Sequence, residues 1–296
     1  MKVSVVIPTY NRHEVLYRTL YSLFRQNDSN YEVIVCNDDD EDKYHLTEEV
    51  VNDFIAKGMP VKSYFTGKYK RGRGWSVETY PYNVGIRKAT GDIIILNSGD
   101  VMSVTATIQQ HRSIHTGKDN LAVFSTVHAL TGAMQNNIDT YDWKNNPMSL
   151  LFPNSTYKMF TGEGISFTGI YRTEEAHTPY HFQMSILKKH LIEIHGFDED
   201  YYGRMTCGDD DMADRLRRKG LVFQFVSSIL AIHQYHGCPE NISGTGGGSK
   251  HNPKVGSGFT LFHDIRSKQN IVRNANHEWG EFPRNMEKLP DMSGPV

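Results

Sequence analysis

The chain has 296 residues, of which 38% are hydrophobic and 22% charged; this composition can form a core and excludes a chain that is disordered throughout. Its 32 basic and 34 acidic residues leave a formal charge of −2, which indicates no general attraction to nucleic acid or anionic lipid. The three cysteines form no C-x-x-C pair, which excludes a disulfide framework and a zinc ribbon. No apolar run approaches the roughly 18 to 20 residues that span a bilayer, so we expect a cytoplasmic protein that could also lie peripherally at a membrane.

The first hundred residues alternate between strand-like and helix-like segments. Short apolar, β-branched runs predict buried strands, and apolar residues that repeat on one helical face predict the helices between them. Such alternation predicts an α/β fold with a mostly parallel sheet and helices on both faces. The strands are predicted at 2–8, 32–36, 61–65 and 93–96, and the intervening helices begin at Asn11 or Arg12, before Val50 and before Val84.

The second half is less regular. Residues 128–165 are polar and turn-rich, which predicts a loop-rich insertion around Trp143. The glycine-rich stretch 237–258 is predicted to be mobile, and the tail 283–296 to be disordered. Further strands are predicted at 121–127, 181–184, 221–226 and 229–232, and helices at 103–115, 185–194, 209–219 and 259–274.

Polar clusters follow two of the predicted strands directly, at residues 37–40 and 97–100. Open sheets of this class bind ligands beyond the carboxyl ends of their strands. Each cluster alone has a simpler explanation, because acidic turns are commonly solvated and Asp100 could cap the helix predicted after it. Only in combination do the clusters indicate a site.

Four segments together resemble glycosyltransferase family 2, the inverting, nucleotide-sugar-dependent enzymes of the GT-A fold. VSVVIPTYNR is similar to the opening strand and turn of that family, and EVIVCNDDDED to its strand followed by Asp-Asp-Gly-Ser. NVGIRKATGDIIILNSGD is similar to the Asn-x-Gly helix, the Gly-Asp and the strand that leads to the metal-binding Asp-x-Asp. GFDEDYYGRMTCGDDDMADRLRRKG is similar to the Gly-Phe-Asp-Glu stretch and the later Glu-Asp acceptor motif. Their order over residues 3–220 carries the resemblance.

The resemblance implies a Rossmann-like GT-A architecture with a C-terminal extension. The GT-A domain is expected over residues 1–236, with a nucleotide-binding half at about 1–102 and an acceptor half at about 103–236. Residues 237–296 then hold the glycine-rich loop, a helix and the tail.

A metal site is implied at the altered Asp-x-Asp, which reads Asn97-Ser98-Gly99-Asp100. The resemblance assigns the metal to Asp100, with Asn97 as a hydrogen-bonding partner. A single carboxylate needs further ligands, and His233 fits the family's histidine position best, with His236 second. Without the resemblance, this H-x-x-H pair would be incidental among 14 histidines. Mixed imidazole and oxygen ligands suit Mn²⁺ better than Mg²⁺.

The general base is implied within the Glu-Asp motif, where Gly208 replaces the glutamate. An inverting transfer needs one base to take the proton of the acceptor hydroxyl. That base maps to Asp209, with Asp210 as the nearest competitor. Capping of the predicted helix by these acids is the structural alternative.

The donor is expected over the first strand ends. By the family pattern, Pro8 and Tyr10 line the base pocket, and Asn37 and Asp38 contact the uracil or ribose. Tyr82 occupies the position of a common arginine. By the same family pattern, Asn83 and Gly85 approach the diphosphate or sugar. Phosphate neutralisation then falls to Arg71 or Arg73, although their basic loop could equally be solvated.

The resemblance predicts an inverting glycosyltransferase that moves a sugar from a nucleotide-sugar donor, most simply a UDP-sugar, to a hydroxyl of a glycan or glycoconjugate. The predicted activity depends on a divalent metal, and no nucleic-acid partner is expected. The altered Asp-x-Asp and the missing glutamate favour an alternative, a non-catalytic nucleotide- or sugar-binding protein on the same fold. Retention of Asp100, His233 and the three acids at 209–211 favours the enzyme.

Overall fold

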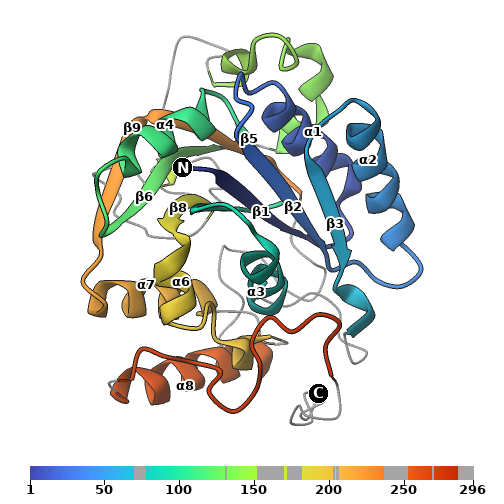
Figure 1. The fold of residues 1–296 in the computed structure, drawn as a ribbon. Helices are drawn as coiled ribbons and strands as arrows, with labels where there is room; N and C mark the ends of the chain where they lie inside the picture. Colours follow the sequence, from blue (N-terminus) through green and yellow to red (C-terminus); the bar gives the residue numbers. More distant parts are fainter. Residues whose placement is uncertain are drawn as a thin grey trace.

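The computed structural model describes residues 1–69, 78–130, 132–151, 170–171, 182–202, 204, 207–236, 253–268 and 270–285. Within these residues, nine strands form one sheet in the order β3-β2-β1-β4-β8-β6-β9-β5, and β7 pairs with β6 (Figure 1). The strands are β1 Val3–Thr9, β2 Tyr31–Asn37, β3 Val61–Phe65, β4 Ile93–Asn97, β5 Val101–Ser103, β6 Leu121–Ala129, β7 Ile170–Tyr171, β8 Gln183–Leu187 and β9 Val222–His233.

The expected α/β fold is confirmed, with a mixed sheet that has four parallel and four antiparallel strand pairings among the described residues. β3, β2, β1 and β4 pair in parallel, and so do β6 and β9. β8 is antiparallel to both β4 and β6, and the short β5 is antiparallel to β9. The helices are α1 His13–Phe24, α2 Tyr44–Ala56, α3 Thr79–Lys88, α4 Thr107–His115, α5 Gly132–Asn136, α6 Lys188–Glu193, α7 Gly208–Arg218 and α8 Pro253–Ser267.

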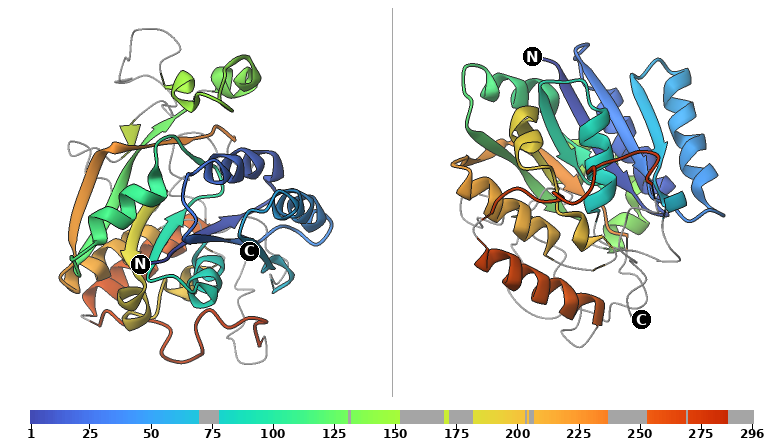
Figure 2. Two further views of the ribbon diagram at one scale, coloured as in Figure 1. Left: turned by 45° about the horizontal axis from the view of Figure 1, so that its top comes forward. Right: turned by 60° about the horizontal axis from the view of Figure 1, so that its bottom comes forward.

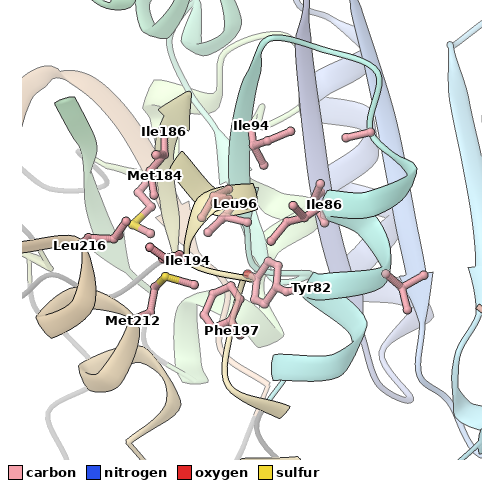
Figure 3. Packing of buried hydrophobic residues seen from close by; sticks show 14 of the residues in the cluster. Tyr82, Ile86, Ile94, Leu96, Met184, Ile186, Ile194, Phe197, Met212 and Leu216 are labelled. Carbon is pink, nitrogen blue, oxygen red and sulfur yellow. The ribbon is translucent and has the colours of Figure 1, made fainter. Parts of the chain in front are cut away.

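Helices cover both faces of the sheet because alternate strand residues point in opposite directions. Ile94 and Leu96 of β4 pack with residues of α3, α6 and α7 in one buried cluster, which Figure 3 shows from close by. Ile93 and Ile95 pack on the other face with residues of α1, α2 and α4. The apolar strand therefore contributes to two cores at once.

Several predicted boundaries were wrong in the second half. The segment predicted as a helix at 185–194 begins with three residues of β8, because Ile186 pairs with both β4 and β6. The strands predicted at 221–226 and 229–232 are one strand, β9, whose register against β6 shifts between Ser125 and Thr126. The helix predicted at 103–115 starts only at Thr107, after β5. Within the insertion around Trp143, short helical turns pack around that buried side chain.

The C-terminal region also differs from the prediction. The helix predicted at 259–274 is α8, which begins at Pro253, within the stretch predicted to be mobile, and ends at Ser267. Residues 270–285, which we call the C-terminal strap, run as an irregular segment past α3 (Figures 1 and 2, red). The tail predicted to be disordered from residue 283 is wrong for its first residues, since Arg284 is only 5% exposed. The rest of that tail, 286–296, and residues 237–252 lie outside the described residues. None of the described helices has the length and apolarity to cross a membrane.

Candidate functional site

The pairing of β5 with β9 brings two histidines to Asp100. Asp100 lies between β4 and β5, and the next residue, Val101, pairs with His233 at the end of β9. His233 Nε2 lies 3.6 Å from Asp100 Oδ1, and His236 Nε2 lies 3.0 Å from Asp100 Oδ2. One ligand atom from each of these three residues lies within 4.8 Å of the others. Both predicted histidines therefore meet the predicted carboxylate.

The Asp100 carboxylate is ionised although it is buried, and one of its oxygens is open to a ligand. Burial by itself would raise the pKa of the Asp100 carboxyl, but His233 and His236 hold that pKa far below its usual range. Asp100 Oδ1 is buried and has no hydrogen-bond partner among the described residues. A buried carboxylate oxygen without a partner is costly unless a cation or donor reaches it. One oxygen and two imidazole nitrogens form a donor set that fits a divalent transition metal.

Arg12 completes the surroundings of this carboxylate. Its Nη1 lies 3.0 Å from Asp100 Oδ2, and its side chain is 19% exposed. Arg12 directly precedes α1, at the edge of the sheet where β1 ends. Arg12 is the last residue of the first motif, but no sequence pattern marked it as a site residue. Arg71 and Arg73, which were predicted to serve the phosphates, lie outside the described residues.

Asp38 follows β2 and is held from two other elements. Its Oδ1 accepts hydrogen bonds from Thr66 Oγ1 at 3.0 Å and from the Tyr202 hydroxyl at 3.2 Å. Gly67 packs against the backbone of the same turn, and a Cβ at this position would lie 1.9 Å from the Asp39 carbonyl oxygen. Only glycine allows this close approach. The chain therefore fixes the acidic turn before any ligand arrives.

The turn after β1 joins the same acidic turn. The Tyr10 hydroxyl donates to Asp40 Oδ2 at 3.1 Å, and burial together with the charge of Asp40 raises the pKa of Tyr10. The Asn11 side chain also donates to Asp40, at 2.7 Å, and the Asn11 backbone N–H donates to Asp39. Pro8 lies buried near the end of β1, beside Cys36 of β2. Pro8, Tyr10 and Asp38 thus lie together at the edge predicted to hold the nucleotide.

Glu78 connects the acids of this edge. It directly precedes α3, and burial together with the charges of Asp100, Asp38 and Asp209 raises its pKa to about 8, against the opposing charge of Arg12. Carboxylates act on one another in this way only at close range. Acids that are distant in sequence therefore lie near Glu78. Glu78 lies outside the four motifs, so no sequence signal indicated it.

The three consecutive acids of α7 differ in their burial and in their contacts. Asp211 is buried and forms an ion pair with Arg215 at 2.7 Å. Asp210 is exposed, and partial desolvation raises its pKa. Asp209 is half-buried, its carboxylate accepts from the Asp210 backbone N–H at 3.0 Å, and its charge acts on Glu78. Of the two candidate bases, Asp209 is the one that lies near Glu78.

Two motif asparagines are enclosed by the protein instead of facing this edge. Asn37 is fully buried and donates to the Tyr44 carbonyl and to Glu48 Oε1. Asn97 is fully buried as well, and its amide N–H groups donate to the Ser98 and Val101 carbonyls. These contacts hold α2 and the turn before β5 in place.

The Asn-x-Gly pair of α3 has a comparable position. Asn83 is fully buried and makes its hydrogen bonds with Phe197 and Glu199. Gly85 faces β1, where a Cβ would lie 2.2 Å from Val6 Cγ1. Gly85 thus permits close packing of α3 on the sheet. The structure places both residues within the scaffold, and their proposed contacts with the donor stay predictions.

Comparison with known proteins agrees with this geometry. Residues 4–128 match the sequence profile of glycosyl transferase family 2. The chain is 29% identical over 273 residues to the uncharacterized glycosyltransferase YfnE of Bacillus subtilis, covering 80% of this chain and 65% of YfnE. It is 25% identical over 247 residues to the chondroitin synthase of Escherichia coli, covering 78% of this chain and 34% of that protein. The chain thus spans about two thirds of the first relative and a third of the second.

Solved structures share the fold. Residues 1–349 of S. aureus TarS in complex with UDP superpose with a TM-score of 0.55 at 15% identity, covering 79% of this chain and 61% of that TarS chain. The mannosyltransferase PcManGT of Pyrobaculum calidifontis, in complex with GDP-Man and Mn²⁺, has a TM-score of 0.51 at 16% identity, covering 81% of this chain and 57% of that structure. GalNAc-T7 with UDP, GalNAc and Mn²⁺ has a TM-score of 0.55 at 12% identity, covering 92% and 55%. These likenesses confirm the GT-A architecture.

Proposed function

Since residues 4–128 match the profile of glycosyl transferase family 2, we propose that this chain is an inverting, metal-dependent glycosyltransferase. The proposed donor is a nucleotide sugar, and the proposed acceptor is a hydroxyl of a glycan or glycoconjugate. The observation that carries the proposal is the Asp100–His233–His236 cluster. The effect of the Asp38, Asp100 and Asp209 charges on the pKa of Glu78 supports a common site for these acids. The donor half is proposed at about residues 1–102 and the acceptor half at about 103–236.

The nucleotide is proposed to lie over the ends of β1 and β2. Pro8 and Tyr10 would line the base, and Asp38 would accept a hydrogen bond from the base or the ribose. The fixed orientation of the Asp38 carboxylate, which Thr66 and Tyr202 hold, supports this assignment because a preorganised acceptor loses little freedom on binding. UDP is the preferred nucleotide because structures of TarS and GalNAc-T7 both contain UDP.

Asp100, His233 and His236 would hold the metal next to the diphosphate. A divalent cation there would offset the negative charge that develops on the leaving nucleoside diphosphate. The two imidazole ligands favour Mn²⁺ over Mg²⁺, and two of the solved relatives contain Mn²⁺. Arg12, which pairs with Asp100, would stand close to the same phosphates.

Asp209 would act as the general base. Its carboxylate takes the proton of the acceptor hydroxyl while that oxygen forms a bond to the anomeric carbon. The bond from that carbon to the diphosphate oxygen breaks on the opposite face, and the nucleoside diphosphate leaves with the electron pair. The configuration at the anomeric carbon therefore inverts. Asp210, one residue further and exposed, is the second candidate.

A non-catalytic nucleotide- or sugar-binding protein is the second candidate function. The single carboxylate of the Asp-x-Asp segment and Gly208 in place of the family's glutamate favour it. Both candidates predict nucleotide binding, and only the enzyme predicts turnover of a nucleotide sugar.

A ligand panel followed by a turnover assay tests the proposal. The melting temperature is measured with UDP, GDP, CDP and dTDP, each with Mn²⁺, Mg²⁺ or chelator, and the enzyme is expected to be stabilised most by UDP with Mn²⁺. Nucleotide sugars of the nucleotide that stabilises the protein most are then incubated with the protein and candidate glycans. NMR determines the anomeric configuration of any product. Nucleotide binding without turnover of any donor supports the binding protein, and no binding at all rejects both functions.

A further inference from the structure

Arg284 of the C-terminal strap is buried between a carboxylate and two aromatic rings. Its Nη2 forms an ion pair with Glu199 Oε2, and both side chains are almost fully buried. The centre of its guanidinium lies 3.8 Å from the centroid of the Tyr80 ring and 5.6 Å from that of Tyr202. The two rings are themselves in edge contact at 5.4 Å. Arg284 therefore contacts both rings of this aromatic pair.

Tyr202 connects this buried arrangement to the proposed nucleotide site. Its hydroxyl donates to Asp38 Oδ1 at 3.2 Å. Burial and the charge of Asp38 raise the pKa of Tyr202 well above its usual value, so the phenol remains a donor at every physiological pH. A shift of the Tyr202 ring would therefore move or break the hydrogen bond that orients Asp38.

Other residues of the strap contact the same glutamate. Glu199 also accepts from the Gly280 backbone N–H at 2.7 Å and lies 3.0 Å from His277 Nε2, so three strap residues meet one carboxylate. These contacts and the Arg284 ion pair hold the pKa of Glu199 below its usual range although burial would raise it. The strap thus places the Arg284 guanidinium at a fixed point before the donor binds.

We propose that Arg284 is a positioning residue of the donor site, which rests on the proposed role of Asp38 in nucleotide binding. Arg284 would touch no substrate. Its guanidinium fixes the Tyr202 ring, and the Tyr202 hydroxyl in turn fixes the Asp38 carboxylate toward the nucleotide. The C-terminal strap is then part of the donor site, although the four sequence motifs end well before it.

Lysine could not replace arginine in this role. A planar guanidinium can pair with Glu199 along its edge and stack on Tyr80 with its face at the same time. A lysine ammonium is a compact charge that could keep the pair with Glu199 but would leave the space beside the rings unfilled. Arg284→Lys therefore separates the ion pair from the contact with the rings.

The test measures UDP affinity by calorimetry in Mn²⁺ for the wild type, Arg284→Lys, Tyr202→Phe and the double variant. Arg284→Lys and Tyr202→Phe are each expected to weaken UDP binding by about three- to tenfold. Because both act through the same hydrogen bond, the double variant should bind UDP no more weakly than the weaker single variant. In a turnover assay, the donor KM should rise with kcat nearly unchanged.

Arg87→Lys is the matched control. Arg87 also holds the strap, through Glu278 at 2.8 Å and the Trp279 ring at 5.2 Å, but neither contact involves Tyr202. It should leave UDP affinity unchanged. If Arg284→Lys fails to fold, Glu199→Gln combined with Arg284→Gln removes both buried charges together, and the same loss of affinity is expected.

The outcomes separate this inference from the proposed function. Normal UDP binding by Arg284→Lys or by the neutral pair, or losses of affinity that add in the double variant, would overturn the inference alone. A lower melting temperature with unchanged UDP affinity would do the same, because it would give Arg284 a structural role only. A wild type that binds none of the four nucleotides would reject the proposed function, and the inference with it.

Discussion

Asn83 donates a hydrogen bond to Glu199 Oε1 at 2.9 Å and joins α3 to the turn that follows α6. Its second amide N–H donates to the Phe197 carbonyl at 2.8 Å, and its oxygen accepts from the Phe197 backbone N–H at 2.7 Å. An asparagine that the family pattern associates with the donor is thus enclosed by the scaffold. The three bonds connect the segment that begins at Glu78 with the segment that carries Tyr202.

Asn83→Ala should lower the stability of the protein more than its nucleotide affinity. The substitution leaves buried partners on Phe197 and Glu199 unpaired, at a cost of about 1–3 kcal/mol for each group. Urea unfolding measures the loss, and calorimetry with UDP measures the affinity. Asn27→Ala, at an exposed position, is the control. If Asn83→Ala is as stable as the wild type but binds UDP weakly, the result would instead support the predicted contact between Asn83 and the donor.

Asp100→Ala should remove the Mn²⁺-dependent part of UDP binding. Asp100 is the only carboxylate of the described three-residue cluster, so the two histidines alone would hold the cation weakly. Calorimetry with UDP is compared in Mn²⁺ and in chelator, and the two affinities should become equal. Asp92→Ala, an exposed carboxylate just before β4, is the control and should retain the difference. Equal affinities in the wild type would exclude the metal site.

Asp209→Asn should lower kcat by roughly 10²–10⁴-fold with little change in UDP affinity, as expected for loss of a general base. Asp210→Asn is the matched variant, because the two side chains are neighbours and differ in exposure. A single-turnover assay with saturating donor measures the chemical step. If only Asp210→Asn reduces the rate, the base is Asp210, and an unchanged rate in both variants removes the assignment from α7.

Glu78→Gln should change how stability depends on pH. The pKa of Glu78 is about 8 in the folded chain, against 4.5 for the ordinary side chain. Between these values the folded state binds the proton and the unfolded state does not, so the wild type loses stability as pH rises from about 5 to 8. Glu78→Gln removes this loss and should be more stable than the wild type at pH 8.5. Urea unfolding in chelator at pH 5, 7 and 8.5 measures the difference, with Glu49→Gln at an exposed position as control; parallel curves for wild type and Glu78→Gln would contradict the raised pKa.

Shortening the chain after Phe282 should destabilise it, whereas the sequence alone predicted no effect. The shorter chain loses Arg284, and breaking a buried ion pair costs roughly 3–5 kcal/mol; the remaining His277 contact with Glu199 offsets part of that cost. A chain that ends at Asn285 retains the pair and is the matched reference. The difference in melting temperature between the two shortened chains isolates residues 283–285. Equal melting temperatures would show that Arg284 contributes nothing to the fold.

The first four strands could be predicted from the sequence because each is a short apolar run with clear limits. β1, β2, β3 and β4 begin and end within one residue of the predicted positions. The boundary between β8 and α6 could not be predicted in this way, since Ile186 and Leu187 suit a buried strand and a buried helix equally. Hydrogen bonding to β4 and β6 decided it.

Asp38, Asp100 and Asp209 could be identified from local sequence motifs, and the two histidines from the family resemblance. Which of these groups meet depends on the tertiary structure. The antiparallel register of β5 with β9 places both histidines beside Asp100. Glu78 lies near the acids of the site although it belongs to no motif. Asn83 forms its hydrogen bonds within the scaffold. Local patterns cannot encode such contacts, because they arise from pairing and packing between segments that are far apart in the chain, and the strap that brings Arg284 to Tyr202 is the most distant of them.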